Sequence, residues 1–381
     1  MHAVQLSWNG ISGWQGQGEI PDRAGLVLYF GGRAALADGR RYNELRDMFP
    51  HAHVVGCSTG GQIRNNDVSD DIAAIALNFA QTRLKLATAV ASSAETSRAC
   101  GESIGRVLAA DDLAGIFVLS DGLNVNGSAL VAGITATAGD SVPVTGGLSG
   151  DGAQFQETLV GGDFAPRKQT VAAIGFYGAA VRIGHGNAGG WDEFGPRRRI
   201  TRASGNVLFE LDGAPALDLY KRYLGDEAAG LPGTALLFPL RIYDPLRPER
   251  ALVRTVLAVD HDNGSMTFAG DMPQGFVSQL MRGNFNRLAA GAAEAARQSV
   301  AAFAQPGDTD SVAILVSCIG RRLLMGQRTV EEVEAAGRAL GTTMPALGFY
   351  SYGEISPHAA SGLSQLHNQT MTVTTITESA R

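Results

Sequence analysis

Apolar runs that end in glycine-rich segments recur through the first half of the chain. Gly25–Phe30 leads into Gly31-Gly32, residues 53–55 lead into GCSTGG, and residues 115–119 lead into SDGLNVNG. A continuous apolar run of this length is typical of a strand that is buried on both faces. Helical patterning follows some of the runs, as at residues 128–138. The order of strand, loop and helix predicts an α/β to α+β fold, with mixed β-sheets flanked by helices.

Length and composition favour two domains. The chain has 381 residues, of which 45% are hydrophobic and 18% are charged. A chain of this length and composition can bury more than one core. Residues 189–202 contain glycine, proline and four arginines, which indicates an exposed crossover near a domain boundary. We expect one domain at residues 1–212 and a second at residues 213–381.

Charge and cysteine content limit the class of protein. Lysine and arginine number 31 against 37 acidic residues, a net charge of −6, which disfavours binding to nucleic acid or to anionic membranes. The three cysteines lie far apart without a CxxC motif, which disfavours a disulfide framework. The longest apolar stretch, Val171–Val181, is shorter than the about 20 residues of a membrane helix, and the N-terminus lacks a secretory pattern. We therefore expect a cytoplasmic protein.

Two helices are predicted from capping patterns. Thr329 with Glu332 three residues later forms a capping-box spacing, and it predicts a helix over residues 329–340. Ser92 and Glu95 have the same spacing before a stretch that runs to Ala110. In both cases the first residue of the pair is expected to cap the helix.

Three glycine-rich loops follow predicted strands and are candidates for a ligand site. They are GCSTGG, SDGLNVNG and GGLSGDG. Ligands of open α/β sheets bind outside the carboxyl ends of the strands, where small residues let backbone N–H groups approach. The alternative is that these loops only turn tightly. The candidate ligand-binding residues here are Cys57, Ser58, Thr59, Gly60, Gly61, Asp121, Gly147, Ser149, Gly150 and Asp151.

A second group of candidates lies near the C-terminus. Residues 346–352 predict a strand on which Tyr350 and Tyr352 project from the same side, because side chains alternate along a strand. Polar side chains beside an aromatic wall suit the recognition of a small polar ligand. The alternative is that the tyrosines pack at a sheet surface. The candidates in this half are Arg321, Tyr350, Tyr352, Glu354, His367 and Asn368.

Catalytic motifs are weak. Residues 56–60 match the GxSxG nucleophile elbow, and Ser58 could join Asp121 or Asp151 and His185 or His367 in a triad. The elbow requires a helix after the turn, whereas the chain continues as the polar stretch QIRNNDVSDD. Cys57 lacks an evident activating group. A hydrolase that uses Ser58 or Cys57 is therefore the less favoured alternative, and we do not expect an enzyme.

The motifs, taken in order, resemble the FIST domain family. The N-terminal part resembles it in GCSTGGQI, FVLSDGLNVNG, GGLSGDGAQFQETLV and RITRASGNVLFELDGAPALDLYKRYLG. The C-terminal part resembles it in SCIGRRLLMG, GFYSYGEISP and LHNQTMTVTTITE. One departure is Gln62, where the family pattern leads us to expect an acidic residue.

The resemblance implies a sensory role. It suggests a signal-input protein that binds a small ligand, such as an amino acid or similar metabolite. FIST-like sequence fills the chain, so the resemblance implies a signalling partner in trans, such as a histidine kinase or a cyclic-di-GMP enzyme. Some free-standing relatives are described as haem-based nitric-oxide sensors, which makes haem a possible cofactor. His367 is then the candidate axial ligand, because haem iron is commonly held by His, Cys or Tyr.

Overall fold

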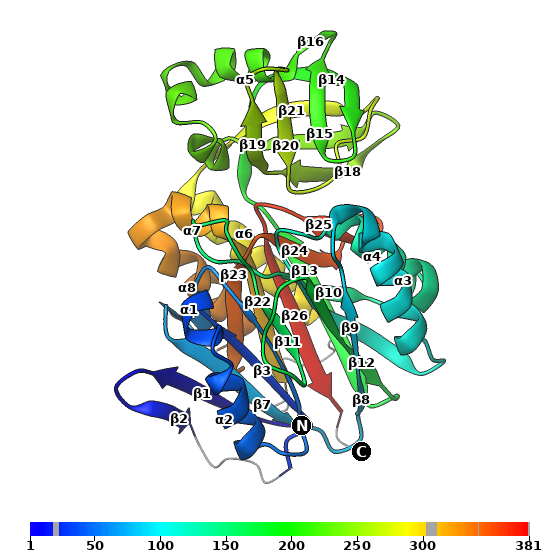
Figure 1. Ribbon diagram of the computed structural model, residues 1–381, viewed down its shortest axis with the longest axis vertical. Coiled ribbons are helices and arrows are strands. Elements are labelled where there is room, and N and C mark those ends of the chain that lie inside the picture. The colour runs from blue at the N-terminus through cyan, green and yellow to red at the C-terminus, as the bar shows by residue number, and fades with distance from the viewer. Residues whose placement is uncertain (18–22, 302–310, 342, 380–381) are drawn as a thin grey trace.

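The computed structural model describes residues 1–17, 23–301, 311–341 and 343–379, which form two lobes (Figure 1). Residues 191–283 build the smaller lobe, and the segments before and after them build the larger lobe. The larger lobe contains three six-stranded mixed sheets, and the smaller lobe contains one eight-stranded sheet. Helices flank these sheets, so the expected α/β to α+β class is confirmed. Among the described residues, no helix combines the length and apolar composition needed to cross a bilayer.

The first sheet has the strand order β11-β4-β3-β7-β1-β2. Helices α1 and α2 connect its parallel pair, β3 and β4. Its elements are β1 (His2–Asn9), β2 (Gly13–Gln17), β3 (Leu26–Gly31), α1 (Arg33–Leu36), α2 (Arg40–Met48), β4 (His53–Ser58), β7 (Ile72–Asn78) and β11 (Val160–Gly162).

The second sheet has the order β25-β24-β10-β9-β12-β8, with α3 and α4 packed together beside it. Helix α4 connects its parallel pair, β9 and β10. Its elements are β8 (Arg83–Val90), η1 (Ala94–Thr96), α3 (Ser97–Leu108), β9 (Leu113–Ser120), α4 (Gly127–Ala138), β10 (Val144–Leu148), β12 (Thr170–Tyr177), β24 (Gly353–Pro357) and β25 (Ser364–His367).

The third sheet has the order β13-β26-β22-β23-β5-β6, and α6 packs against α8 outside it. Its parallel pair is β22 and β23. Its elements are β5 (Gln62–Arg64), β6 (Asp67–Ser69), β13 (Val181–Ala188), α6 (Phe285–Ala301), β22 (Ser311–Cys318), α7 (Ile319–Met325), η4 (Gly326–Arg328), α8 (Thr329–Leu340), β23 (Ala346–Ser351) and β26 (Met371–Glu378).

The smaller lobe is antiparallel, with the order β18-β17-β21-β14-β15-β20-β19 and β16 paired to β15. Its elements are β14 (Trp191–Ser204), β15 (Val207–Leu211), β16 (Ala214–Pro215), α5 (Ala216–Leu224), η2 (Gly225–Gly230), η3 (Gly233–Leu237), β17 (Leu240–Asp244), β18 (Arg247–Arg254), β19 (Val256–Asp260), β20 (Ser265–Phe268) and β21 (Val277–Gly283).

The three sheets of the larger lobe share one arrangement. Each has a parallel pair followed by an antiparallel strand, namely β4-β3-β7, β10-β9-β12 and β23-β22-β26. After each parallel pair, the next strand along the chain belongs to a different sheet. After β4, strand β5 joins the third sheet; after β10, strand β11 joins the first; and after β23, strand β24 joins the second. The segments that cross between the sheets are hydrogen-bonded to one another, and we call the region that they form the junction. They are residues 58–61, 149–152 and 350–353.

One core lies between the three sheets. Leu28 and Phe30 of β3 share a cluster of buried residues with Phe117 of β9 and Phe349 of β23. Side chains alternate along a strand, so Val27 and Tyr29 instead belong to the cluster that includes α2. Burial on both faces explains why these strands read as continuous apolar runs.

Three sequence predictions differ from the structure. Residues 191–204, which overlap the exposed crossover expected at residues 189–202, form strand β14 and pair with β15 and β21, although most of them are exposed as expected. The N-terminal capping box before α3 uses Ser93 and Thr96 in place of Ser92 and Glu95. The N-cap of α8 is Arg328, and Thr329 is already helical.

The predicted boundary after residue 212 falls within the smaller lobe. It separates β15 from β16, which pair with each other. The spatial lobes therefore divide the chain differently from the predicted domains. Strands from both predicted domains also share the second and third sheets.

Candidate functional site

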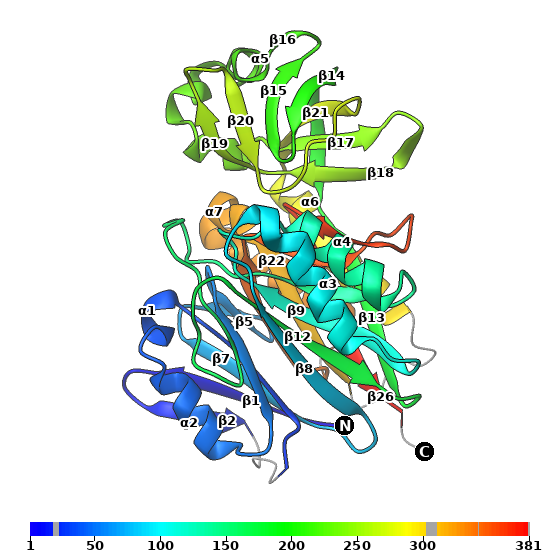
Figure 2. The ribbon, with the colours of Figure 1, turned by 45° about the vertical axis from the view of Figure 1, so that its right-hand side comes forward.

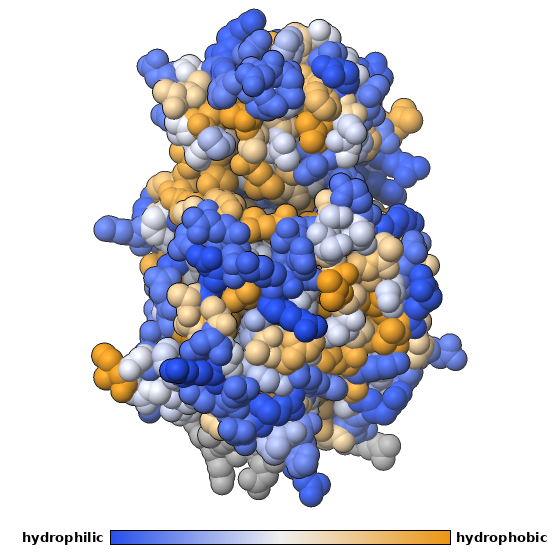
Figure 3. Space-filling view, in the orientation of Figure 1, coloured by the Kyte–Doolittle hydropathy of each residue, from blue (hydrophilic) through white to orange (hydrophobic). Residues whose placement is uncertain are grey.

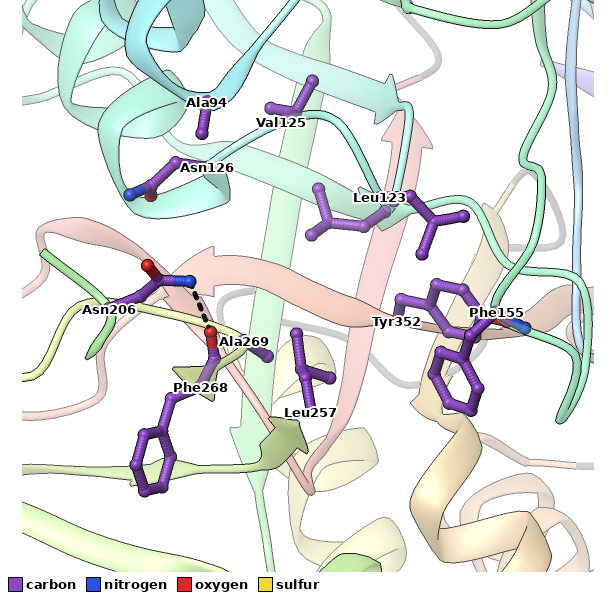
Figure 4. A pocket seen from close by; sticks show the side chains of 12 residues that line it. Ala94, Leu123, Val125, Asn126, Phe155, Asn206, Leu257, Phe268, Ala269 and Tyr352 are labelled. Carbon is purple, nitrogen blue, oxygen red and sulfur yellow. Dashed lines mark hydrogen bonds between the residues drawn. The ribbon is translucent and has the colours of Figure 1, made fainter. Parts of the chain in front are cut away.

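Two adjoining cavities lie between the lobes, and we call them together the interlobe cleft. The smaller cavity, of about 190 Å³, is shown in Figure 4. The larger, of about 500 Å³, adjoins it through Phe155 and Leu257, which line both. Ligand sites usually measure about 300–1,000 Å³ and are mostly apolar. The smaller cavity is lined by Ala94, Gly122, Leu123, Val125, Asn126, Leu148, Phe155, Asn206, Leu257, Phe268, Ala269 and Tyr352.

Exposed apolar side chains concentrate at this cleft. Leu123, Phe155, Leu257 and Leu323 are each between 38% and 43% exposed, and all four line one or both cavities. Figure 3 shows hydrophobic side chains gathered at the waist between the lobes. Contiguous exposed apolar patches on folded proteins commonly mark binding surfaces.

Asp151 fixes the loop that carries Phe155. Its carboxylate accepts hydrogen bonds from the backbone N–H groups of residues 155, 156 and 157 at 2.9–3.0 Å. The Tyr352 hydroxyl donates to the same carboxylate and to the Gly152 carbonyl. The Tyr352 ring stacks on Phe155, with centroids 4.6 Å apart and planes 13° apart. The aromatic pair is therefore held in place by one buried acid.

The ionisation of this pair follows from its contacts. Burial acts to raise the pKa of Asp151, but the hydrogen bonds from Tyr352 and the three backbone N–H groups outweigh it, and the pKa is lowered. Burial, followed by the neighbouring carboxylate, raises the pKa of Tyr352. At neutral pH the site therefore holds a carboxylate and a neutral phenol.

A second acid organises the facing loop of the larger lobe. Asp121 accepts hydrogen bonds from the backbone N–H groups of Leu123 and Asn124 at 2.8 and 2.9 Å, and from that of Gln169 at 2.8 Å. The same loop ends at Asn126, whose side chain caps α4 and donates to Asp271 of the smaller lobe at 2.9 Å. This loop therefore lines the cleft and also bonds across it.

The smaller lobe supplies the opposite wall of the cleft. Leu257 of β19 and Asn206 lie opposite the loop residues in Figure 4, whereas the ring of Phe268 of β20 points away from them and belongs to the core of the smaller lobe. Asn206 Nδ2 donates to the Phe268 carbonyl at 2.7 Å. Among the described lining residues of the two cavities, none is charged. The cleft therefore presents aromatic and aliphatic surface with amide groups at its edge.

The residues predicted from the glycine-rich loops mostly lie at the junction. The Gly60 N–H donates to the Tyr350 carbonyl, and the Gly150 N–H donates to the Ser58 carbonyl, both at 2.9 Å. A Cβ on Gly150 would lie 3.2 Å from the Tyr352 ring. All of the predicted site residues are buried. Of the whole set, Tyr352 alone lines the interlobe cleft, as far as the described cavity walls show.

Several of the remaining predicted residues serve the packing of the junction. Ser58 Oγ accepts from the Leu159 N–H, and Ser149 Oγ donates to the Ser120 carbonyl, both at 2.9 Å. Gly147 pairs with Glu354 in the second sheet. Thr59, Gly60, Gly61 and Asp151 line a separate polar pocket of about 280 Å³ beside Arg33 and Arg322.

Arg321 and Tyr350 meet at a buried acid on α8. Arg321 is an ion-pair partner of Glu332 at 2.6 Å, and both side chains are fully buried. The Tyr350 hydroxyl donates to the same carboxylate at 2.9 Å. Arg321 also donates to the carbonyls of Gly189 and Leu288, at the two points where the chain passes between the lobes. Glu332 therefore anchors the network instead of completing a capping box.

Glu354 lies in the same region but in a different network. It accepts from Ser351 Oγ at 2.7 Å and from Thr370 Oγ1 at 2.9 Å. Burial raises the pKa of Glu354 to about 8, and these hydrogen bonds only partly oppose it. Asn368 is fully buried, and neither its Oδ1 nor its Nδ2 has a hydrogen-bond partner among the described residues.

His367 does not fit the role of a haem ligand. Its Nε2 is 3.0 Å from the Ser356 carbonyl, which can only accept, so that nitrogen carries the proton. The ring is 3% exposed, and the described cavity walls do not include it, so no open space for a haem reaches its Nδ1. Among the described lining residues of the cleft and of the polar pocket beside Arg33 and Arg322, none is a histidine or cysteine. The Tyr352 hydroxyl is committed to Asp151.

Ser58 and Cys57 lack the surroundings of a nucleophile. No hydrogen bond joins Ser58 to His185 or His367 in the described part of the chain, and burial raises the pKa of the Cys57 thiol. No cluster of three metal-ligating side chains occurs among the described residues. The geometry therefore gives the hydrolase alternative no support.

The fold and the cleft define a two-lobed α/β protein with a largely apolar cavity between its lobes. Comparison with family models matches a FIST N domain to residues 25–214 and a FIST C domain to residues 216–357. The chain belongs to the FIST family, whose domains are sensory modules that bind small ligands in signal transduction. A comparison with curated proteins found no match.

Sequence reasoning missed Phe155, Leu257, Phe268 and Asn206, and it included Asn126 only as part of the candidate loop SDGLNVNG. They come from separate segments, and only the folded chain brings them to one cavity. One local signal was available, because Phe155 is a lone aromatic residue in a polar loop directly after GGLSGDG. Nothing in the sequence near Leu257 distinguishes it from an ordinary strand residue.

Proposed function

We propose that this chain is a cytoplasmic signal-input protein that binds a neutral, largely apolar small molecule in the interlobe cleft. The observation that carries the proposal is the Phe155–Tyr352 stack, which Asp151 holds at the wall shared by both cavities. A flat ring or a branched alkyl group suits such a wall. An amino acid is a weaker candidate for this cleft, because no described lining residue supplies a counter-charge for its ends.

The proposed output is a change in the relation between the lobes. A ligand in the cleft contacts loops of the larger lobe and strands β19 and β20 of the smaller lobe. It favours whichever arrangement of the lobes it binds better, and only by that difference in affinity. We propose that a partner in trans, such as a histidine kinase or a cyclic-di-GMP enzyme, reads this arrangement. That partner class rests on the family resemblance alone.

A thermal-shift experiment tests the proposed ligand class. Indole serves as the neutral probe, and tryptophan, tryptamine and indole-3-acetate are its charged analogues. Saturation with a ligand that binds only the folded state raises the melting temperature. We expect indole to stabilise the protein more than any charged analogue. Equal stabilisation by all four compounds, or none by indole, would contradict the proposal.

A further inference from the structure

The polar pocket beside Arg33 and Arg322 lies where strands of the larger lobe end. Its volume is about 280 Å³, and its walls include residues 32–34 and 59–62, which directly follow the parallel strands β3 and β4. Ligands of open α/β sheets bind outside the carboxyl ends of the strands. None of the described residues that line this pocket also lines the interlobe cleft. The pocket is therefore a second, separate place where the fold favours a ligand.

Two guanidinium groups reach this pocket from different elements, α1 and α7. Arg33 Nη2 donates to Gln154 Oε1 at 2.5 Å, and Arg33 Nη1 has no hydrogen-bond partner within the described residues. Both Nη atoms of Arg322 are hydrogen-bonded, to Asp70 Oδ1 at 3.1 Å and to the Gly60 carbonyl, whereas its Nε has no such partner there. The side chains of Arg33 and Arg322 are 27% and 26% exposed, so both are accessible to a solute.

The two acids of the pocket leave much of this positive charge available. Asp151 Oδ2 is 3.9 Å from Arg33 Nε, but the Asp151 carboxylate is buried and accepts the four hydrogen bonds described above. Asp70, the ion-pair partner of Arg322, has a side chain that is 84% exposed. An ion pair this exposed contributes little, because solvent screens it. An anion in the pocket can therefore compete with Asp70 for Arg322.

The loop after β4 holds Arg322 in place. A Cβ on Gly61 would lie 2.0 Å from Arg322 Nη1, so a side chain at this position would displace the guanidinium. Gly61 has a φ of +133°, which residues with a side chain rarely adopt. The guanidinium also lies over the Tyr350 ring, 5.6 Å from its centroid. A cation that is held in place before a ligand arrives loses less conformational entropy on binding.

We propose that this polar pocket binds the phosphate group of a small molecule. The free donors, Arg33 Nη1 and Arg322 Nε, belong to two separate guanidinium groups. A phosphate dianion has enough charge and enough terminal oxygens to accept from both, and guanidinium groups suit phosphate geometry. A carboxylate carries one charge on two oxygens and matches two guanidinium groups less well. The site shares no lining residue with the interlobe cleft, so it stands or falls independently of the proposed function.

Calorimetric titration with four compounds at constant ionic strength tests the ligand class. They are glycerol 3-phosphate, inorganic phosphate, D-glycerate and glycerol. We expect both phosphates to bind saturably, D-glycerate to bind at least about tenfold more weakly, and glycerol not to bind. Tighter binding of glycerol 3-phosphate assigns a phosphate ester, and equal or tighter binding of inorganic phosphate assigns free phosphate. Equal affinity for D-glycerate, or no binding of either phosphate up to roughly 10 mM, would overturn the proposal.

Removal of one cation locates the binding. Arg33→Gln removes a guanidinium group from the pocket, so we expect it to weaken the binding of the phosphates at least about tenfold. Arg40→Gln removes the same charge at a position outside the pocket, where the side chain is 76% exposed. This control is expected to keep the affinity of the parent. Equal affinities in the two variants would place the phosphate elsewhere and overturn the assignment.

Removal of the competing acid gives a test that does not depend on a loss. Asp70→Asn takes away the exposed carboxylate that pairs with Arg322, so we expect the phosphates to bind about threefold or more tightly. Asp111→Asn makes the same change of charge at an exposed position outside the pocket and is expected to change the affinity much less. Equal affinities in these two variants would show that the phosphate does not lie beside Arg322, and would overturn the proposal.

Discussion

Asp151 is the residue on which the candidate site depends most. It accepts from three successive backbone N–H groups and from the Tyr352 hydroxyl, and thereby fixes both the loop and the aromatic wall. From the sequence, Asp151 was predicted to contact the ligand directly. In the structure its carboxylate is committed to the protein, and Phe155 presents the binding surface.

Substitution of Asp151 tests this role. In Asp151→Asn an amide N–H₂ replaces one acceptor oxygen, so we expect the free energy of unfolding to fall by about 1–3 kcal/mol. The lowered pKa of Asp151 gives a stabilisation that is present above the unfolded value of about 3.9 and is lost as the pH falls through the folded pKa. Urea unfolding at several pH values measures both effects. Asp111→Asn, at an exposed position, is the control, and equal losses in the two variants would contradict the account.

Glu354 gives the opposite dependence on pH. Its folded pKa of about 8 lies above the unfolded value of about 4.3. Its contribution to stability is therefore complete below the unfolded pKa and is lost as the pH rises through the folded one. We expect the stability of the parent, relative to Glu354→Gln, to decline between about pH 4.3 and pH 8. The same comparison with Glu334→Gln, on the exposed side of α8, should show no such decline. If the difference in stability between the parent and Glu354→Gln did not change with pH, Glu354 would not be a buried, protonated acid.

At the scale of elements, the helices and strands with clear apolar periodicity were the most predictable feature. The helix predicted at residues 329–340 has the bounds of α8. Apolar periodicity is local, so a single sequence carries it. Caps were less predictable, because Ser, Thr and Glu near a helix start satisfy several alternatives. Glu332 faces the core because a buried cation, Arg321, lies there.

The buried Arg321–Glu332 ion pair anchors α8 to the rest of the larger lobe. Removing one partner leaves the other charge buried and unpaired, so Glu332→Gln is expected to lower the free energy of unfolding by about 3–5 kcal/mol. Glu331→Gln, one residue earlier and exposed, should cause a much smaller loss. Chemical denaturation of both variants provides the comparison. A small effect at Glu332 would show that the network does not anchor the helix.

At the scale of the molecule, the exchange of strands between three sheets was not predictable from the sequence. No internal repeat in the sequence indicates this exchange of strands. The paired strands also come from parts of the chain that are far apart in sequence. The predicted glycine-rich loops do converge, and residues 58–61 and 149–152 form the packed junction. Residues of SDGLNVNG line the interlobe cleft, and residues of GCSTGG and GGLSGDG line the polar pocket beside Arg33 and Arg322. The cleft walls depend on how the lobes sit together, and no local pattern encodes that relation.

The two-lobed arrangement predicts a response to ligand. Ile11 is 100% exposed in the larger lobe and Leu246 is 88% exposed in the smaller lobe, while the native cysteines are buried. Dyes attached to Ile11→Cys and Leu246→Cys therefore report the distance between the lobes (Figure 2 shows both lobes, turned by 45° from the view of Figure 1). We expect indole to narrow or shift the distribution of energy-transfer efficiencies. An unchanged distribution at saturating indole would contradict a signal passed through lobe motion.

Calorimetric titration of indole into two phenylalanine variants tests the central claim most directly. Phe155 lines both cavities of the cleft, whereas Phe194, with a similar exposed fraction of 36% against 38%, lies on β14 outside them. The account predicts saturable binding to the parent and to Phe194→Ala, and a loss of about tenfold or more in Phe155→Ala. Equal affinity for all three proteins would show that the interlobe cleft is not the binding site.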